Sequence, residues 1–234
     1  MNEEKGDMRP PSEGKGPKGR RVRPSYAGLF CMILCFLVVS GFEDRHTLVW
    51  AAGICLKIAI FVLALHISDV GRKFLLATAS LAVIVAGASV PARIYGGELE
   101  ALVLLTWSAM MLLVPVAILR KIGKEFSEGG VDLEVVLGAL CAYLYIGAYF
   151  AFLYDVMARI SESPFFAQPG ADSKLNYLYF SFVTLTTTGY GDISPAYGPA
   201  RMIAVTEAVI GQLYLVSVVA IVVSAFRKGK KSPS

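Results

Sequence analysis

Long apolar runs separated by short polar loops limit how this chain can fold more than any other feature of its sequence. A helix needs roughly 20 predominantly apolar residues to cross the hydrocarbon core of a bilayer. The chain is 56% hydrophobic and 17% charged, whereas about 25% of the residues in a soluble domain are charged. We therefore expect an all-α membrane protein with six transmembrane helices. The six runs are residues 26–42, 47–67, 73–90, 99–119, 131–160 and 199–226.

A further apolar segment, residues 175–187, is too short to cross a bilayer and ends in a loop rich in Thr and Gly. Irregular backbone is tolerated at membrane depth only where protein or a water-filled cavity satisfies its polar groups. We expect a re-entrant hairpin here, in which a half-helix enters the membrane between the fifth and sixth spans and a loop returns to the same side.

Basic residues in the loops predict the orientation. Arg72 and Lys73 follow the second run, and residues 120–124 add two lysines and an arginine after the fourth. Because basic loops stay in the cytoplasm, we expect a multi-pass protein of the cell membrane with both termini cytoplasmic. Basic residues also crowd both ends of the chain, and anionic lipid headgroups explain them without a nucleic-acid partner.

The composition divides the chain into four parts. Residues 1–24 are rich in Gly, Pro and Lys and lack apolar periodicity, so we predict a disordered, basic cytoplasmic tail. Residues 25–124 form a peripheral domain of four helices, and residues 125–227 form a second domain around the Thr- and Gly-rich loop. A short basic tail, residues 228–234, follows on the cytoplasmic side.

The run Thr-Thr-Gly-Tyr-Gly-Asp at residues 187–192 carries the chemistry. A potassium ion must lose its water in a narrow pore, and backbone carbonyls can replace that water if they all point at one axis. Glycine permits the necessary backbone angles. The Thr187 hydroxyl adds an oxygen at the inner end, and the Tyr190 ring points away from the axis, where its packing can hold the width of the filter.

This run resembles the signature sequence of potassium channels, with Thr188 where Val or Ile is also common. The resemblance extends over residues 131–226, whereas the first four helices resemble the family only in number and topology. It implies potassium coordination at Thr187, Thr188, Gly189 and Tyr190, with Gly191 completing the selectivity filter. It also implies filter support from three residues: Asp192, and Tyr179 and Phe180, which match the paired aromatic residues of the family's pore helix.

One such loop cannot enclose an ion, because each coordination plane needs oxygens from several sides. The chain has a single loop of this kind and no internal repeat, so we expect a homotetramer around a central axis. The expected function is passive, selective potassium flux, with no enzymatic activity and no cofactor besides the permeant ions. Whether an unknown regulatory partner binds is left open.

The fourth run argues against a voltage sensor. Residues 99–119 contain Glu100 near one end and no Arg or Lys. Moving one charge through the membrane field contributes about 2.3 kcal/mol per 100 mV, and steep gating needs several charges in each subunit. We therefore expect weak or absent voltage dependence.

Three residues have two open interpretations each. Lys57 lies near the middle of the second run, where it could form a gating ion pair or extend its amine into a hydrated crevice. Glu207 could face the cavity and attract cations, or face the pore helix and bind a threonine hydroxyl. Gly211 lies where the family places its gating hinge, but glycine is also common where membrane helices pack closely.

Three other functions compete with a potassium channel. A nonselective cation channel usually has a degraded Gly-Tyr-Gly triplet, which is intact here. A potassium transporter repeats related loops several times within one chain, and this chain has one. A silent subunit that conducts only with partners remains open.

Overall fold

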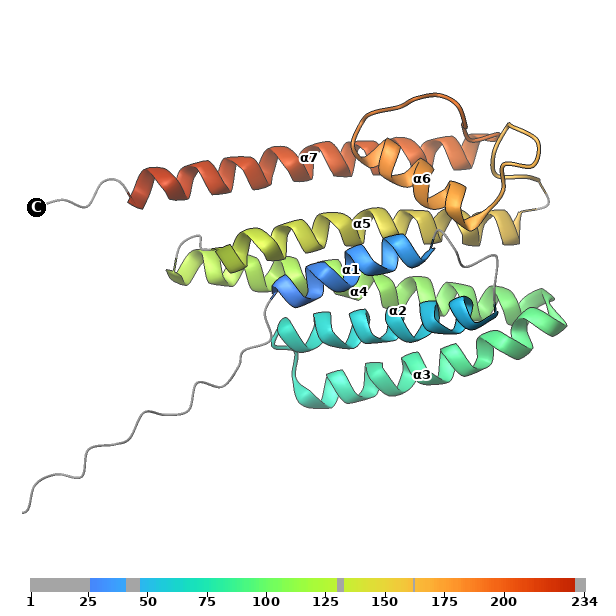
Figure 1. Cartoon of the computed structure of the whole chain (residues 1–234), viewed down its shortest axis with the longest axis horizontal. Coiled ribbons are helices and arrows are strands. Elements are labelled where there is room, and N and C mark those ends of the chain that lie inside the picture. The colour runs from blue at the N-terminus through green and yellow to red at the C-terminus, as the bar shows by residue number, and fades with distance from the viewer. Residues whose placement is uncertain (1–25, 41–46, 130–132, 162, 230–234) are drawn as a thin grey trace, which may run out of the picture.

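The computed structural model describes residues 26–40, 47–129, 133–161 and 163–229 (Figure 1). These residues form seven helices, and their only β-structure is an isolated bridge between Phe166 and Pro195. The prediction of an all-α chain is thus confirmed for this part of the protein. The predicted tail at residues 1–24 and the end of the second tail, residues 230–234, lie outside the described residues.

Within the described residues, four helices are long and apolar enough to cross a membrane. They are α3 (Arg72–Tyr95), α4 (Gly97–Gly129), α5 (Leu133–Ile160) and α7 (Gly198–Gly229). The helices α1 (Tyr26–Ser40) and α2 (Thr47–Ile67) are also apolar, but their described parts are shorter than the other four. The protein is embedded in a membrane, and the count of six spans stays a prediction.

The helices α3, α4 and α7 extend past their predicted ends, α3 and α4 the furthest. The helix α3 continues through Pro91 and ends at Tyr95, and the backbone N–H of the next residue, Gly96, donates to the carbonyl oxygen of Ala92 at 2.8 Å. Proline inside a membrane helix is tolerated where neighbouring groups satisfy the freed backbone. The helix α4 continues to Gly129, because no proline interrupts its polar end. The expected division of the chain after residue 124 therefore falls inside a helix.

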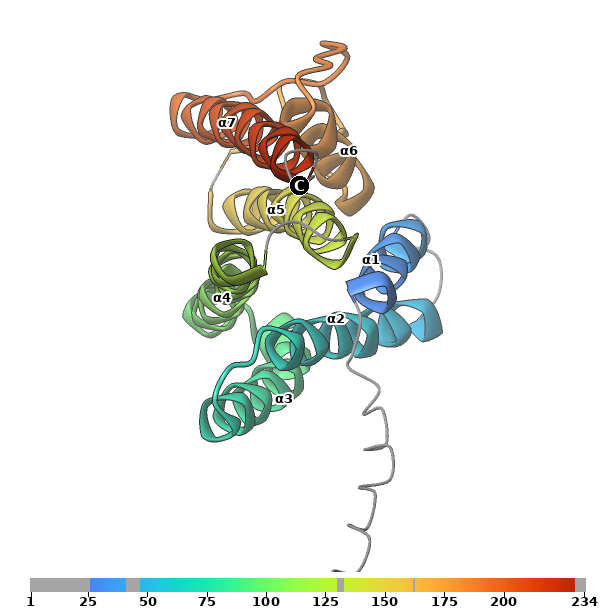
Figure 2. The ribbon, with the colours of Figure 1, turned by 90° about the vertical axis from the view of Figure 1, so that its left-hand side faces the viewer.

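The helix α5 is the centre of the fold. It contacts α1 and α4 on one side and α6 (Lys174–Leu185) and α7 on the other, and the helices α2 and α3 lie outside α1 and α4 (Figure 2). At its start, the Glu134 carboxylate accepts from the backbone N–H of Tyr26 at 2.9 Å. Close by, a Cβ on Gly138 would lie 3.1 Å from the Tyr26 ring. The start of α1 is thus fixed to the start of α5.

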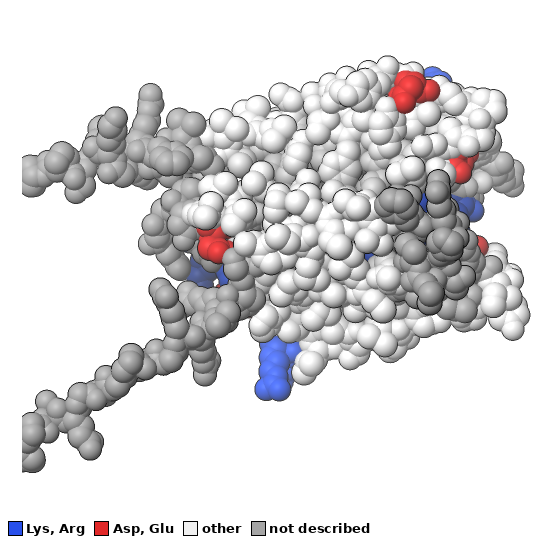
Figure 3. Space-filling view, viewed as in Figure 1, with Lys and Arg blue, Asp and Glu red and all other residues white. Residues whose placement is uncertain are grey.

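The charged side chains that show on one face lie chiefly near the two ends, and most of that surface is uncharged (Figure 3). At one end, Lys121 forms an ion pair with Asp69 at 2.8 Å and also donates to the Ile67 carbonyl oxygen. At the other end, Arg159 pairs with Glu100 at 3.1 Å and with Asp155 at 2.9 Å. Charged ends around an apolar middle suit a bilayer.

Candidate functional site

The helix α6 positions the Thr- and Gly-rich loop. Its first turn is capped by the Ser173 hydroxyl, which accepts from the backbone N–H of Asn176 at 3.2 Å. Residues three and four apart lie on one face of a helix, and that face of α6 is buried against α5 and α7. The buried residues are Tyr177, Phe180, Ser181 and Leu185. The loop that follows returns to the end of α5 and α7 at which α6 begins (Figure 1).

The sign of φ alternates along the loop. Thr187, Gly189 and Gly191 have φ of 58°, 56° and 77°, whereas Thr188 and Tyr190 have no positive φ. Glycine adopts such angles freely. A β-branched residue such as Thr187 adopts them only at a cost of about 1–3 kcal/mol and only where its surroundings enforce them.

Hydrogen bonds to the end of α6 hold the loop backbone in this conformation. The backbone N–H groups of Thr187 and Thr188 donate to the carbonyl oxygens of Thr184 and Val183, both at 2.9 Å, and the N–H of Gly189 also donates to Val183, at 3.3 Å. The peptide bonds are trans, so each carbonyl points opposite to the N–H of the same peptide unit. The carbonyl oxygens of residues 186, 187 and 188 therefore point away from α6. Three consecutive carbonyls on one side form a row that can bind cations.

The threonine hydroxyls of the loop differ in their contacts. The Thr186 hydroxyl donates to the Phe182 carbonyl oxygen at 2.7 Å and lies 2.8 Å from the Thr188 hydroxyl. Thr188 stands where Val or Ile is common in potassium channels, and the Thr188 hydroxyl has the Thr186 hydroxyl as its hydrogen-bond partner. Among the described residues the Thr187 hydroxyl has no hydrogen-bond partner, so its oxygen is available to a ligand.

Tyr179 connects α6 to the far end of the loop. Its ring is stacked on that of Tyr190, with centroids 6.4 Å apart and planes 3° apart, and its hydroxyl donates to Asp192 at 2.8 Å. The hydrogen bond to Asp192 raises the pKa of the Tyr179 phenol, and its loss of hydration adds to the shift. The two predicted support residues Tyr179 and Asp192 thus contact each other. The third, Phe180, instead packs against Tyr154 and Phe165, with ring centroids 5.4 and 6.2 Å away.

The segment before α6 contacts the chain that leaves the loop, which sequence reasoning did not predict. Phe165 and Ala167 pair with Ala196 and Ser194 through backbone hydrogen bonds of 2.8 Å each. The Gln168 side chain also accepts from the backbone N–H of Ser194 at 2.9 Å and donates to its hydroxyl at 3.2 Å. The loop is therefore held at both ends, by α6 before it and by this pairing after it.

A protein-family model described as "Ion channel" matches residues 138–228. This part of the chain, which is less than half of its length, is similar to ion channel domains. No curated protein matches the chain. The matched residues include most of α5, all of α6, the loop and nearly all of α7. The loop whose carbonyls form a row lies near the middle of the matched residues.

Glu207 is fully buried and does not face an open cavity. It lies on α7 and accepts hydrogen bonds from the Tyr154 hydroxyl of α5 and the Ser181 hydroxyl of α6. The Ser181 hydroxyl also lies 2.7 Å from the Gly147 carbonyl oxygen. The interpretation of Glu207 as a cavity charge is therefore wrong. It faces α6, with a serine as partner in place of the threonine that we expected, and no pattern in the sequence marked Ser181 or Tyr154.

Gly211 lies where α7 contacts the last residue of α6. A Cβ at this position would lie 2.6 Å from the Leu185 carbonyl oxygen and 2.8 Å from its Cδ1. The Tyr143 hydroxyl of α5 donates to that carbonyl at 3.2 Å. Close packing therefore accounts for this glycine, and its role as a hinge stays a prediction.

Lys57 is half-buried on α2, and its amine lies 5.4 Å from the centroid of the Phe36 ring. A cation over an aromatic face is stabilised by the ring quadrupole. Lys57 also lines a cavity between the first four helices and the channel domain. Both interpretations of Lys57, the gating ion pair and the hydrated crevice, stay predictions.

Proposed function

We propose that this chain is one subunit of a potassium-selective channel that conducts potassium ions passively through a homotetrameric pore. The observation that carries the proposal is the direction of the carbonyl groups of residues 186–188. They point away from α6 because the following N–H groups bind the end of that helix. Carbonyl rings that replace the hydration shell are the basis of potassium selectivity. In this proposal Thr187, Thr188, Gly189, Tyr190 and Gly191 coordinate the ions.

The exposed surface of the loop and α7 supports assembly into a tetramer. In a single chain Tyr190 is 70% exposed, and apolar residues of α7 such as Leu213 and Val216 are 62% and 59% exposed. Four copies around an axis would cover this surface and bring four rows of carbonyls together. The loop would then be re-entrant from outside the cell, with both termini in the cytoplasm.

Potassium flux into liposomes that contain the purified protein tests the proposal. Flux driven by a potassium gradient is expected to exceed flux driven by an equal sodium gradient at least tenfold, and Gly189→Ala is expected to abolish it. Gly170 has a similar φ of 73° and open space around it, but it lies outside the loop. Gly170→Ala therefore carries the same backbone penalty of about 1–2 kcal/mol and is expected to leave the flux intact.

Other outcomes would point to the competing functions. Equal sodium and potassium flux would contradict selectivity and indicate a nonselective cation channel. A stable tetramer without flux in either gradient would contradict a pore that conducts by itself, and would indicate a silent subunit.

A further inference from the structure

A cavity of about 200 Å³ lies where the first four helices meet α5 and α6. It is separate from the filter loop, and neither the channel domain match nor the proposed conduction assigns it a role. Most residues of its walls are apolar, such as Ile33 of α1, Ile60 of α2, Val103 and Met111 of α4, and Phe152 of α5, and Lys57 of α2 also lines it. Figure 2 views the bundle along its length and shows α1, α2, α4 and α5 around a common centre.

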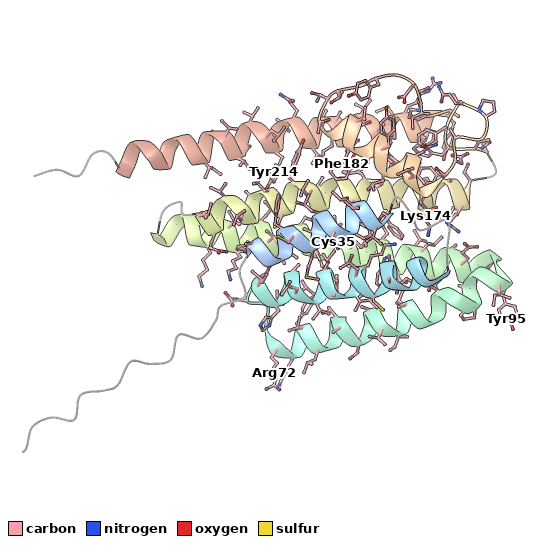
Figure 4. All side chains as sticks on the ribbon, in the orientation of Figure 1. Cys35, Arg72, Tyr95, Lys174, Phe182 and Tyr214 are labelled. Atoms are coloured by element: carbon pink, nitrogen blue, oxygen red, sulfur yellow. The ribbon has the colours of Figure 1, made fainter. Side chains whose placement is uncertain are left out.

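The charged residues of the cavity lie mainly at one end. Glu100, Asp155, Arg159 and Lys174 line it where α4 begins, α5 ends and α6 begins. This is the end of the bundle that carries the filter loop, and Lys174 lies there in Figure 4. A cavity with apolar depth and a charged rim has the polarity of an amphiphile, whose tail is apolar and whose head is charged.

The size of the cavity limits what can occupy it. Pockets that enclose a drug-sized ligand measure about 300–1,000 Å³. This one is smaller and partly open to its surroundings, so it holds only part of a molecule and leaves the remainder outside. The surroundings of a membrane-embedded bundle are lipid, which makes an acyl chain the apolar group most available to fill it.

We propose that the cavity binds a bilayer phospholipid, with one acyl chain in the apolar depth and the phosphate at Arg159 and Lys174. The Arg159 guanidinium has five N–H donors and uses one with Asp155 and one with Glu100. Donors therefore remain for phosphate oxygens, which arginine binds well. The bound lipid would contact the peripheral helices and the channel domain at once.

Fluorescence quenching tests the position of the acyl chain. The chain has two tryptophans, and one of them, Trp107, lines the cavity. In a Trp50→Phe variant of the full chain, placed in bilayers of phospholipid brominated at mid-chain, bromine in the cavity quenches Trp107. Filling the cavity with Ala86→Phe on α3 is expected to remove most of this quenching. Ala77→Phe on the same helix, at an exposed position outside the cavity, is the matched control and is expected to retain it.

Equal quenching in the Ala86→Phe and Ala77→Phe variants would overturn the proposal, because Trp107 would then be sensing only the surrounding bilayer. If Ala86→Phe does not fold, a second pair on α4 gives the same comparison. Val103→Phe fills the cavity, whereas Val116→Phe places the same side chain at a position that is 38% exposed and outside it.

Native mass spectrometry of the protein in detergent tests the headgroup. We expect a retained adduct with the mass of a phospholipid, and about fivefold less of it in Lys174→Gln, because one basic residue contributes roughly that much to phospholipid binding. Lys124→Gln, at the other end of α4, is expected to retain the adduct. An adduct with the mass of a free fatty acid, or equal retention in the two variants, would overturn the assignment of the phosphate.

Discussion

Glu207 lies where α5, α6 and α7 meet, and its two carboxylate oxygens contact the hydroxyls of Tyr154 and Ser181. The side chain is fully buried, so water cannot replace either partner. The Ser181 hydroxyl has one hydrogen and two neighbouring acceptors, Glu207 and the Gly147 carbonyl. A side chain at position 207 that accepts a hydrogen bond from the Tyr154 hydroxyl and donates one to the Ser181 oxygen would leave the Ser181 hydrogen for the Gly147 carbonyl. Every polar group in this cluster would then have a partner.

Glutamine has this property, so Glu207→Gln is expected to keep the assembly stable. Glu207→Leu has a similar volume but leaves a buried hydroxyl without its acceptor, at a cost of about 1–3 kcal/mol per orphaned group. Thermal unfolding of the purified protein in detergent is expected to rank wild type and Glu207→Gln together and Glu207→Leu clearly below them. Equal midpoints for the two variants would mean that these hydrogen bonds do not stabilise the fold.

If the loop is the filter that we propose, the Tyr179 hydroxyl is expected to matter for selectivity, because it donates to Asp192 at the far end of the loop. Tyr179→Phe keeps the ring stacked on Tyr190 but loses the hydrogen bond to the Asp192 carboxylate. The potassium-to-sodium flux ratio is expected to fall severalfold. Tyr177 is the matched control, since it lies on the same helix and donates at 2.9 Å to Asp172, which is outside residues 187–192. If Tyr177→Phe lowers the ratio as much, the effect is not specific to the loop.

At the scale of the helices, the contact between α7 and the end of α6 determines how the start of the loop is supported. Gly211 allows the backbone of α7 to lie directly against Leu185, where a Cβ would be only 2.6 Å from the carbonyl oxygen. A backbone atom cannot move aside as a flexible side chain can. Any larger residue at this position must therefore separate α7 from α6.

Gly211→Ala is expected to lower the thermal stability of the protein by about 1–3 kcal/mol, as overpacking does. Gly87→Ala provides the control, because Gly87 is inside α3 with no atom near its added Cβ. Alanine is the better helix former, so this control is expected to be neutral or stabilising by about 0.5–1 kcal/mol. Unchanged stability in Gly211→Ala, combined with a lower open probability in single-channel recordings, would favour the hinge interpretation instead.

At the scale of the whole molecule, the described ion pairs lie at the two ends of the bundle. The residues of α4 between Leu99 and Leu119 include Glu100 and no Arg or Lys. Lys57 is the basic residue near the middle of α2, beside the Phe36 ring. One charge that crosses the full field contributes about 2.3 kcal/mol per 100 mV, far below what steep gating requires.

In planar bilayers, the open probability of the channel is therefore expected to change only weakly between about −100 and +100 mV. At either limit, one charge that crosses the full field contributes roughly 2 kcal/mol. Lys57→Met, which keeps the length of the side chain and removes its charge, is expected to leave that response unchanged. A steep change of open probability with voltage in the wild type would show that a charge inside the peripheral helices senses the field. A voltage response that Lys57→Met removes would show the same.

The sequence alone determined the all-α class, the positions of the long apolar helices and the place of α6 and its loop. These features depend on local chemistry: apolar length predicts a helix in a membrane, and Gly189 and Gly191 permit the backbone that the loop adopts. The ends of α3 and α4 were less predictable, because a proline or a polar stretch stops a helix only when neighbouring groups do not compensate.

Only the tertiary structure decided which residues support the loop. Tyr154, Ser181 and Glu207 are far apart in sequence, and whether a buried carboxylate faces a cavity or two hydroxyls depends on how three helices pack. The same is true of Gly211, whose neighbour Leu185 belongs to another helix. Hydrophobic patterns specify which residues leave water, but not which partners they meet there, because that choice depends on contacts between segments far apart in the chain.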